Sequence, residues 1–363
     1  MRKTTLILLG TLLVLPLSVQ ALADGQCPNE PLYGLAYGPF REEQSPGGLE
    51  PNIAEIHQDL QIIAGKAHAI RTYGVDGILA EIPRLCQEYD IDCYVGCHID
   101  GDPCQDADTI ERLLLIADAN YVTTKGLLVG NEYLTAHESD PCSPSYLIGL
   151  IEYVKSRTNL PVSTGEDWLR WHLEPSLVPA VDFIASNHYA FHRGIGIELA
   201  AYENVLNYNS MKAAYPDKEV ILFETGWPTD GASIGAAVPS EENQARFLRE
   251  FLPLAKTHNI KYFIFEAFDE PWKYRPDAPY ESHLGCYNVS RSPKVGISSI
   301  CAASMADVNF DGTVNLVDYA ALAADWLDIR DKDDLCYPAD LNHNCIVDQQ
   351  DLSLMASYWL ESE

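Results

Sequence analysis

Apolar runs of strand length recur eight times along this chain, and stretches with helical periodicity lie between several of them. The runs cover residues 32–37, 67–73, 91–97, 127–132, 161–165, 181–189, 220–225 and 262–268. Between the first two runs, Ile53, Ile56 and Leu60 recur at spacings of three and four residues, which indicates an amphipathic helix. Eight parallel strands, each followed by a helix, within roughly 270 residues predict an α/β fold, the (β/α)8 or TIM barrel.

An open, doubly wound sheet is the alternative for the same alternation. That fold carries a glycine-rich phosphate turn after its first strand, and no such turn follows residues 32–37. A barrel instead requires its active residues at the carboxyl ends of the strands, and polar and aromatic residues do gather there. They are Tyr37, Arg71, Tyr73, His98, Glu132, His188, Tyr189, Glu224 and the segment 268–270.

Glutamates end two of the apolar runs, Glu132 after residues 126–131 and Glu224 after residues 219–223. A buried carboxylate costs several kcal/mol unless it is paired or hydrogen-bonded, so two of them at strand ends point to a site. Retaining glycoside hydrolysis uses two carboxyl groups about 5–5.5 Å apart, one as acid/base and one as nucleophile. The pair therefore predicts a glycosidase.

The neighbours of these glutamates suit a sugar substrate. Asn131 is placed to donate a hydrogen bond to a sugar 2-hydroxyl, a contact that strengthens in the transition state. Aromatic side chains cover the apolar faces of sugar rings. The candidate aromatic platforms are Tyr37, Tyr73, Trp168, Trp171, Tyr189, Trp227, Phe268 and Trp272.

Some of these residues have a structural role as the alternative to a catalytic one. In that interpretation Glu132 is a buried ion-pair partner of Arg71, and Glu266 is a hydrogen-bonded residue of the barrel interior. His188 is expected in the wall of the site as a hydrogen-bonding residue rather than a metal ligand. His98, beside several aspartates, is interpreted as part of a loop, and Asp269 as a possible strand-end cap.

Five motifs in chain order resemble glycoside hydrolase family 17, the β-1,3-glucanases. They are Gly34–Pro39, Arg71–Tyr73, Val129–Glu132, Glu224–Pro228 and Phe265–Lys273. The resemblance implies retaining endo-hydrolysis of β-1,3-glucan such as laminarin, with Glu132 as acid/base and Glu224 as nucleophile. Glu270 and Lys273 match an accessory acid and lysine that border the family's site. The expected substrate-binding residues are Tyr37, Arg71, Tyr73, Asn131, His188, Tyr189, Trp227, Phe268, Glu270 and Lys273.

Two other functions use the same features. A second glucan that outcompetes water makes the enzyme a β-1,3-glucan transglycosylase. A non-catalytic glucan-binding or scaffold protein is the third hypothesis, and the presence of both glutamates argues against it.

A duplicated acidic motif begins at Asp307 and again at Asp340. Oxygen side chains at positions 1, 3, 5, 9 and 12, with a backbone carbonyl at position 7, are typical of a calcium loop. The first copy offers Asp307, Asn309, Asp311, Thr313, Asn315 and Asp318, and the second Asp340, Asn342, Asn344, Ile346, Asp348 and Asp351. Cys345 replaces the turn glycine Gly312, which predicts weaker binding in the second loop. Paired Asx turns without metal are the alternative.

This repeat resembles the type I dockerin module, over residues 307–360. The resemblance implies a small all-α domain with structural Ca²⁺ that docks onto a cohesin of a scaffold or cell-surface protein. A calcium-stabilised appendage without any cohesin partner is an equal alternative.

Residues 1–23 have the charged start, apolar stretch and Ala21-Leu22-Ala23 cleavage site of a signal peptide, which predicts secretion. The expected domains are a barrel at 24–301, a linker at 302–306 and the dockerin-like module at 307–363. The mature chain is expected to be a monomer without a membrane span, and catalysis to need no cofactor.

Charge and cysteine content narrow the function further. The net charge of −29 excludes nucleic acid as a partner, because phosphate contacts need clustered lysine and arginine. Ten cysteines in an exported chain favour disulfides. Local bridges are expected among the pairs Cys86–Cys93, Cys97–Cys104 and Cys336–Cys345.

Overall fold

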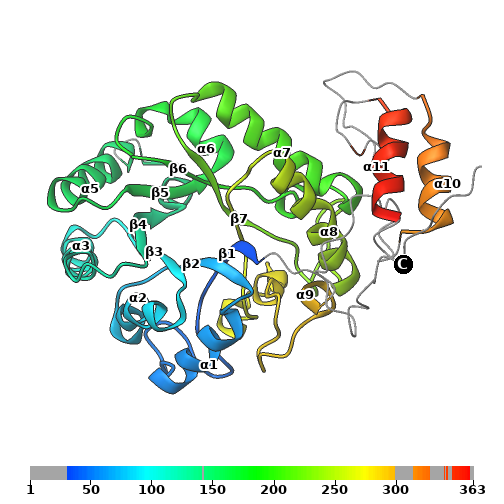
Figure 1. Ribbon diagram of the computed structural model, residues 1–363. Helices are drawn as coiled ribbons and strands as arrows, with labels where there is room; N and C mark the ends of the chain where they lie inside the picture. The colour runs from blue at the N-terminus through cyan, green and yellow to red at the C-terminus, as the bar shows by residue number, and fades with distance from the viewer. Residues whose placement is uncertain are drawn as a thin grey trace, which may run out of the picture.

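The computed structural model describes residues 31–140, 143–298, 314–327, 339, 341 and 346–359. Eight parallel strands close into a barrel, in which each strand pairs with the next along the chain and the last pairs with the first. Figure 1 shows the helices wrapped around the outside of this barrel. The predicted (β/α)8 architecture is confirmed, and an open sheet is excluded.

All eight predicted runs overlap a strand, although β4 begins three residues before its run and β5 ends two residues after its run. The strands are β1 (Leu32–Ala36), β2 (Ala67–Arg71), β3 (Asp92–Cys97), β4 (Thr124–Asn131), β5 (Val162–Asp167), β6 (Ile184–Asn187), β7 (Val220–Thr225) and β8 (Tyr262–Ile264). The predicted eighth run extends to residue 268, but β8 ends at Ile264. Beyond it the amide of Glu266 donates to the carbonyl of Leu284, outside the barrel ladder.

The helices described around the barrel are α1 (Ile53–Ile63), α2 (Ile82–Cys86), α3 (Pro103–Asp118), α4 (Tyr133–Ala136), α5 (Ser143–Arg157), α6 (Trp168–Leu173), α7 (Ile197–Ala214), α8 (Glu241–Thr257) and α9 (Val295–Ser298). The predicted helix is confirmed as α1, in which Ile56 and Leu60 are buried as expected, whereas Ile53, at its first position, is 42% exposed. Asn52 and Glu55 form a capping box that satisfies amides at its start.

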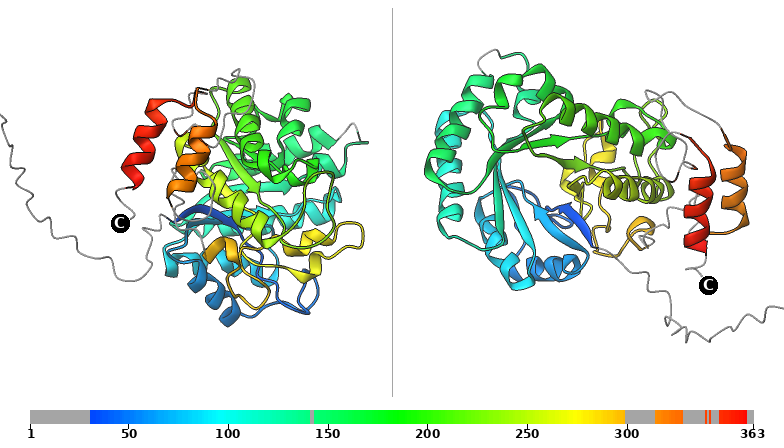
Figure 2. Two further views of the ribbon diagram at one scale, coloured as in Figure 1. Left: turned by 90° about the vertical axis from the view of Figure 1, so that its right-hand side faces the viewer. Right: turned by 45° about the horizontal axis from the view of Figure 1, so that its top comes forward.

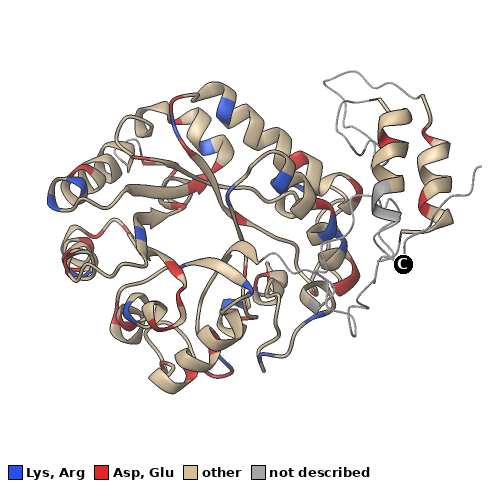
Figure 3. Ribbon diagram, in the orientation of Figure 1, with Lys and Arg blue, Asp and Glu red and all other residues tan. Residues whose placement is uncertain are grey.

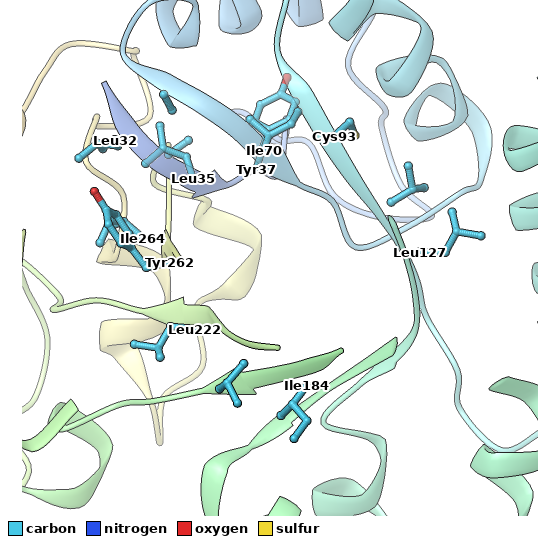
Figure 4. Close-up of a cluster of buried hydrophobic side chains, with 14 of the residues drawn as sticks. Leu32, Leu35, Tyr37, Ile70, Cys93, Leu127, Ile184, Leu222, Tyr262 and Ile264 are labelled. Atoms are coloured by element: carbon cyan, nitrogen blue, oxygen red, sulfur yellow. The ribbon is translucent and has the colours of Figure 1, made fainter. Parts of the chain in front are cut away.

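Apolar side chains form two layers, one inside the barrel and one between barrel and helices. Along β7, Leu222 belongs to the outer layer, whereas Ile221 and Phe223 belong to the inner one. Figure 4 shows outer-layer members on several strands, among them Leu35 and Ile70. The inner rings of Phe223 and Phe263 stack at 4.8 Å and fill the barrel. The interior of the barrel is therefore filled with apolar side chains, and the polar side chains lie at the carboxyl ends of the strands.

The described part of the C-terminal repeat contains two helices, α10 (Leu316–Ala324) and α11 (Gln349–Trp359). They lie side by side in both views of Figure 2. Leu322, Val347 and Met355 are buried together, and the amide of Leu327 donates to the carbonyl of Val347 at 2.8 Å. The two copies of the repeat thus pack on each other.

Cysteine pairing differs from the prediction. Cys86, Cys93, Cys97 and Cys104 are free in this structure, so neither local bridge expected among them is formed. Cys97 is buried at the end of β3, whereas Cys104 is exposed at the start of α3. A strand end and a loop separate Cys97 from Cys104. The side chains of Cys86 and Cys93 do meet, as a thiol hydrogen bond that raises the pKa of Cys93.

Several predictions fall on residues that the structure does not describe. These are the signal peptide at 1–23, the linker at 302–306 and the Cys336–Cys345 pair. Across the described ranges, no helix is both long and apolar enough to cross a membrane.

Candidate active site

Polar side chains from β2, β4, β6 and β7 meet at the carboxyl end of the barrel and form the candidate active site. Arg71, Asn131, Asn187 and Glu224 come from these strands, and Glu132 directly follows β4. Figure 3 shows acidic positions at strand ends as well as on the outer helices. Of the strand-end residues singled out from the sequence, Arg71, Asn131, Glu132 and Glu224 thus meet in one site, together with Asn187.

Glu224 is surrounded by donors. Arg71 Nη1 lies 2.8 Å from its Oε1, which also accepts from the Tyr73 hydroxyl at 3.0 Å. Its other oxygen accepts from the Tyr189 hydroxyl at 2.8 Å. Burial raises the pKa of Tyr73 and of Tyr189 well above 10, so both keep the proton that they donate. The positive charge of Arg71 and the two tyrosine hydroxyls favour the ionised form of Glu224, which is the form that a nucleophile requires.

Glu132 has a different environment. The Nδ2 of Asn187 donates to its Oε1 at 3.0 Å, and no cation of the described residues pairs with it. Burial, together with the negative charge of Glu224, raises the pKa of Glu132 to about 7, although the Asn187 hydrogen bond lowers it. A carboxyl group tuned in this way holds a proton near neutral pH and can release it. The alternative pairing of Glu132 with Arg71 is wrong, because Arg71 binds Glu224.

Two asparagines connect the glutamates. Asn187 also reaches Asn131 Oδ1 at 3.4 Å, and Arg71 Nη2 donates to the same oxygen at 3.2 Å. A continuous path therefore runs from Glu132 through Asn187, Asn131 and Arg71 to Glu224. Because the Oδ1 of Asn131 is used as an acceptor, its NH2 group is the part left to face a ligand.

Register shifts in the strand pairing determine the direction of the Glu132 and Glu224 side chains. Between β4 and β5, Leu128 faces Ser163 but Asn131 faces Gly165, which leaves one extra residue in β4. Between β6 and β7, Ser186 faces Leu222 but Asn187 faces Glu224, so β7 also holds an extra residue. An extra residue redirects the following side chain, and such bulges are common beside active sites.

A second charged cluster follows β8. Lys273 Nζ lies 2.5 Å from Glu266 and 2.7 Å from Glu270, and sits 4.4 Å from the centre of the Phe265 ring. Burial raises the pKa of Glu266, and the positive charge of Lys273 opposes this rise. Burial also lowers the pKa of Lys273, but the two carboxylates outweigh this and keep it charged. Glu266 is thus an interior residue, as one sequence interpretation held, yet it belongs to this cluster.

Several predicted substrate-binding residues lie behind the site rather than in it. Tyr37 is 1% exposed and donates to Asp59, Trp227 is 1% exposed and donates to the carbonyl of Val238, and Phe268 has no exposed surface. His188 is also fully buried, where burial lowers its pKa to about 3, and its Nε2 lies 2.8 Å from Ser186 Oγ. These side chains support the wall.

The aromatic residues proposed as platforms divide in the same way. Trp171 is fully buried and donates to the carbonyl of Ala185, whereas Trp272 is 42% exposed beside Phe40. Trp168 lies between these extremes, with the Arg193 guanidinium 4.8 Å from its ring centre. Among the proposed platforms, partly or fully exposed aromatic surface therefore comes from Tyr73, Trp168 and Trp272.

Sequence reasoning missed Asn187, the donor to Glu132. The signal was present, since Asn187 ends an apolar run just as Asn131 does and directly precedes His188. It also missed Glu166, a fully buried acid on β5. Glu166 ends no apolar run, and nothing in its sequence context separates it from a surface residue.

The calcium loops are described only in part. Asn315, Asp318, Ile346, Asp348 and Asp351 are described, and the other proposed ligands lie outside the described residues. Asp318 and Asp351 have no exposed surface, and each accepts a backbone N–H at 2.8 Å, from Asn315 and from Asp348. Across the described ranges, no group of three metal-ligating side chains occurs. The donors present are oxygens in equivalent positions of both copies, which fits Ca²⁺ chemistry.

Known proteins that are similar to this chain are glycoside hydrolases. The family described as the BtgE/BtgC glycoside hydrolase domain matches residues 34–285. A putative glucan endo-1,3-beta-glucosidase btgC of Aspergillus niger is 30% identical over 311 residues, which are 77% of this chain and 45% of that protein. A probable glucan endo-1,3-beta-glucosidase btgC of Aspergillus terreus is 25% identical over 277 residues, 68% of this chain and 42% of that protein. The chain thus spans less than half the length of these curated relatives.

Solved structures share the fold. The glycoside hydrolase family 17 beta-1,3-glucanosyltransferase from Rhizomucor miehei aligns with a TM-score of 0.64 and 26% identity, over 74% of this chain and 97% of that one. An endo-laminarinase from Formosa Hel1_33_131 aligns with a TM-score of 0.62 and 21% identity, over 92% and 94%. The second likeness concerns the fold alone. By the family match over residues 34–285, this chain belongs to the BtgE/BtgC glycoside hydrolase family.

Proposed function

We propose that this protein is a secreted retaining endo-β-1,3-glucanase that acts by double displacement. The observation that carries the proposal is the contrast between two neighbouring carboxyl groups. Glu224 is bound by Arg71 and two tyrosine hydroxyls, whereas the pKa of Glu132 is raised to about 7. Retaining glycosidases need this division between an ionised nucleophile and a protonated acid.

In the first step Glu132 donates its proton to the glycosidic oxygen while Glu224 attacks the anomeric carbon. The bond to the leaving sugar breaks, and a glycosyl ester of Glu224 forms. The ester carries no charge, so one cause of the raised pKa of Glu132 disappears. Glu132, now a carboxylate, takes a proton from water, and the oxygen of that water attacks the anomeric carbon and releases Glu224.

Two measurements on the full secreted chain test this mechanism. NMR of fresh laminarin digests is expected to show the β-anomer first, and an inverted first product would overturn the mechanism. A 2-deoxy-2-fluoro laminaribioside with a dinitrophenol leaving group is expected to label Glu224, which peptide mass spectrometry identifies. Lichenan and chitin as parallel substrates establish linkage preference, and an N-terminal sequence starting at Asp24 supports secretion.

A second candidate function is β-1,3-glucan transfer. It is favoured by the 26% identical structure, which is a beta-1,3-glucanosyltransferase. The chemistry differs only in whether water or a second sugar attacks the glycosyl ester. Chromatography of laminaripentaose digests separates the two, because transfer makes products longer than the substrate and hydrolysis does not.

For the C-terminal repeat we propose a calcium-stabilised, dockerin-like module that docks onto a cohesin. Support comes from the duplicated oxygen donors and from the packed helix pair with exposed apolar residues, among them Leu316, Val317 and Tyr319 on α10. Pull-down of the full chain on an immobilised cohesin panel, with and without EDTA, tests it. Loss of binding in EDTA is expected. Capture that is unchanged by EDTA, or absent with every cohesin, contradicts the proposal and favours a partnerless appendage.

A further inference from the structure

Glu166 is a buried acid that the proposed reaction does not use. It lies on β5 and has no exposed surface. Its Oε1 accepts from the backbone N–H of Leu134 at 2.8 Å, and its Oε2 lies 3.4 Å from the Thr135 hydroxyl. Both partners belong to the short helix α4, which begins one residue after Glu132.

The backbone at Glu132 needs such support. Its φ angle is 53°, in the left-handed region that residues with a side chain rarely adopt. A strained conformation of this kind persists only where the surroundings enforce it, and it is found preferentially at functional sites. Without restraint, the backbone here would relax and the carboxyl group of Glu132 would turn away from its present position.

Three consecutive residues of β5 provide the restraint. The Thr164 hydroxyl donates to the carbonyl of Gly130, before the turn. The carbonyl of Gly165 accepts the N–H of Glu132 at 2.7 Å, at the turn itself. Glu166 binds the first residues after the turn. Hydrogen bonds therefore restrain Glu132 at its own amide and also restrain the residues before and after it in the chain.

Glu166 acts from behind the site. A Cβ atom added to Gly165 would meet Asn131 Oδ1, so the side-chain direction at residue 165 is toward the site. Neighbouring residues of a strand point to opposite faces, which turns Glu166 toward the helices. It cannot reach a substrate at the barrel mouth, and this excludes a direct chemical role.

A neutral side chain at residue 166 can also accept the hydrogen bond from the Leu134 N–H. Burial raises the pKa of Glu166 to about 8, an effect to which the charge of Glu132 adds. The carbonyl oxygen of a carboxylic acid still accepts from the Leu134 N–H. Glutamine has the same length and a similar acceptor, and methionine fills similar volume without one.

We propose that Glu166 is a positioning residue for the acid/base: its acceptor oxygen caps α4 and holds the left-handed turn that aims the carboxyl group of Glu132. This inference rests on the proposed function of Glu132. It assigns to β5 the backbone support of the proton carrier, while Arg71 of β2 binds the nucleophile and Asn187 of β6 donates to the carboxyl group of Glu132.

The test compares Glu166→Gln and Glu166→Met in the full chain on two substrates. Laminarin needs protonation of its leaving group, whereas a dinitrophenyl β-laminaribioside does not. For Glu166→Met we expect kcat on laminarin to fall about 100-fold, within the range that general acids contribute. KM and the glycosylation rate on the activated substrate should stay within about twofold, and azide should accelerate turnover of that substrate. Glu166→Gln should stay within about threefold of wild type.

Glu250→Met is the matched control, because Glu250 is another buried glutamate with a raised pKa, on α8 and outside the site. It should leave the ratio of the two activities unchanged. Equal loss on both substrates for Glu166→Met would indicate a purely structural role and overturn the proposal, as would equal loss in the Gln and Met variants or no loss in either.

A structural readout separates this proposal from the proposed function. Amide hydrogen exchange at residues 132–136 should be faster in Glu166→Met than in wild type, whether or not the protein cleaves glucan. Unchanged exchange contradicts the positioning role. A wild-type protein that is inactive on every glucan would contradict the proposed function instead.

Discussion

Asn187 faces Glu224 across the β6–β7 ladder, while its amide donates to Glu132 at 3.0 Å. One neutral side chain therefore sits between the two carboxyl groups of the site. Its hydrogen bond favours the charged form of Glu132 and lowers the pKa that burial and Glu224 raise. The balance of these effects leaves the acid/base near neutrality.

Replacing Asn187 by alanine should raise the pKa of Glu132, since the donor to its carboxylate is lost. The alkaline limb of kcat/KM on laminarin should move to higher pH, and kcat should fall by roughly tenfold because deprotonated Glu132 is the base of the second step. A pH–rate profile from 4 to 10 measures both. Asn207, a largely buried asparagine of α7, offers a control in Asn207→Ala, whose limb should not move. An Asn187→Ala limb shifted to lower pH would contradict the assignment.

The pKa of Glu132 should change during the catalytic cycle. In the free enzyme it is raised to about 7, partly by the charge of Glu224, and that charge is absent in the glycosyl ester. NMR titration of ¹³C-labelled glutamate carboxyls, before and after trapping with the 2-fluoro sugar, should show a lower pKa in the trapped enzyme. Glu224→Gln, which also removes the charge, should reproduce the drop. An unchanged pKa in both forms means that the two groups are not electrostatically coupled.

The fold could be predicted from the sequence because the spacing of apolar residues and the polar residues at strand ends are local features. The direction in which each side chain points could not be predicted in this way. Side chains alternate along a strand, so one extra residue in β4 or β7 exchanges the faces, and apolar patterning does not reveal it. Tyr37 and Trp227, which the sequence predicts in the site, are instead buried in the apolar layer between strands and helices. The pairing of Arg71 with Glu224 also depends on contacts between distant strands.

Arg71 should be the residue whose loss damages stability and activity together. Its Nη1 binds Glu224 and its Nη2 binds Asn131, and it has no exposed surface. Arg71→Met leaves a buried carboxylate without its cation, which costs about 3–5 kcal/mol in comparable pairs. Urea unfolding should show this loss, and activity on laminarin should fall at least about 100-fold.

Arg71→Lys is the informative companion. Lysine keeps the charge but lacks the fork that spans two partners, so it should recover stability more than activity. Equal activity of the lysine variant and wild type would indicate that only the charge matters.

Buried glutamates should make the barrel less stable as pH rises. The folded pKa values of Glu132, Glu166 and Glu250 are about 7, 8 and 7, above the ordinary value of 4.5. Between these limits the folded state binds more protons than the unfolded state, so the free energy of unfolding decreases with pH. Stability is greatest near pH 4.5 with respect to these groups and is lost as pH approaches 8. Glu166→Gln should flatten the decrease in a series of thermal melts, and a steeper decrease would refute the assignment.

Calcium removal should affect the C-terminal repeat and leave the barrel intact. Asp318 and Asp351 occupy equivalent places at the starts of α10 and α11, and both are fully buried. If Ca²⁺ neutralises such carboxylates, EDTA should lower the melting temperature of a separate C-terminal transition by several degrees, since a ligand that binds only the folded state stabilises it. Asp318→Asn should imitate EDTA more strongly than Asp351→Asn, because the second loop carries Cys345 in place of glycine and is expected to bind more weakly. Laminarin hydrolysis should be unchanged in EDTA, and its loss would mean that calcium also supports the barrel.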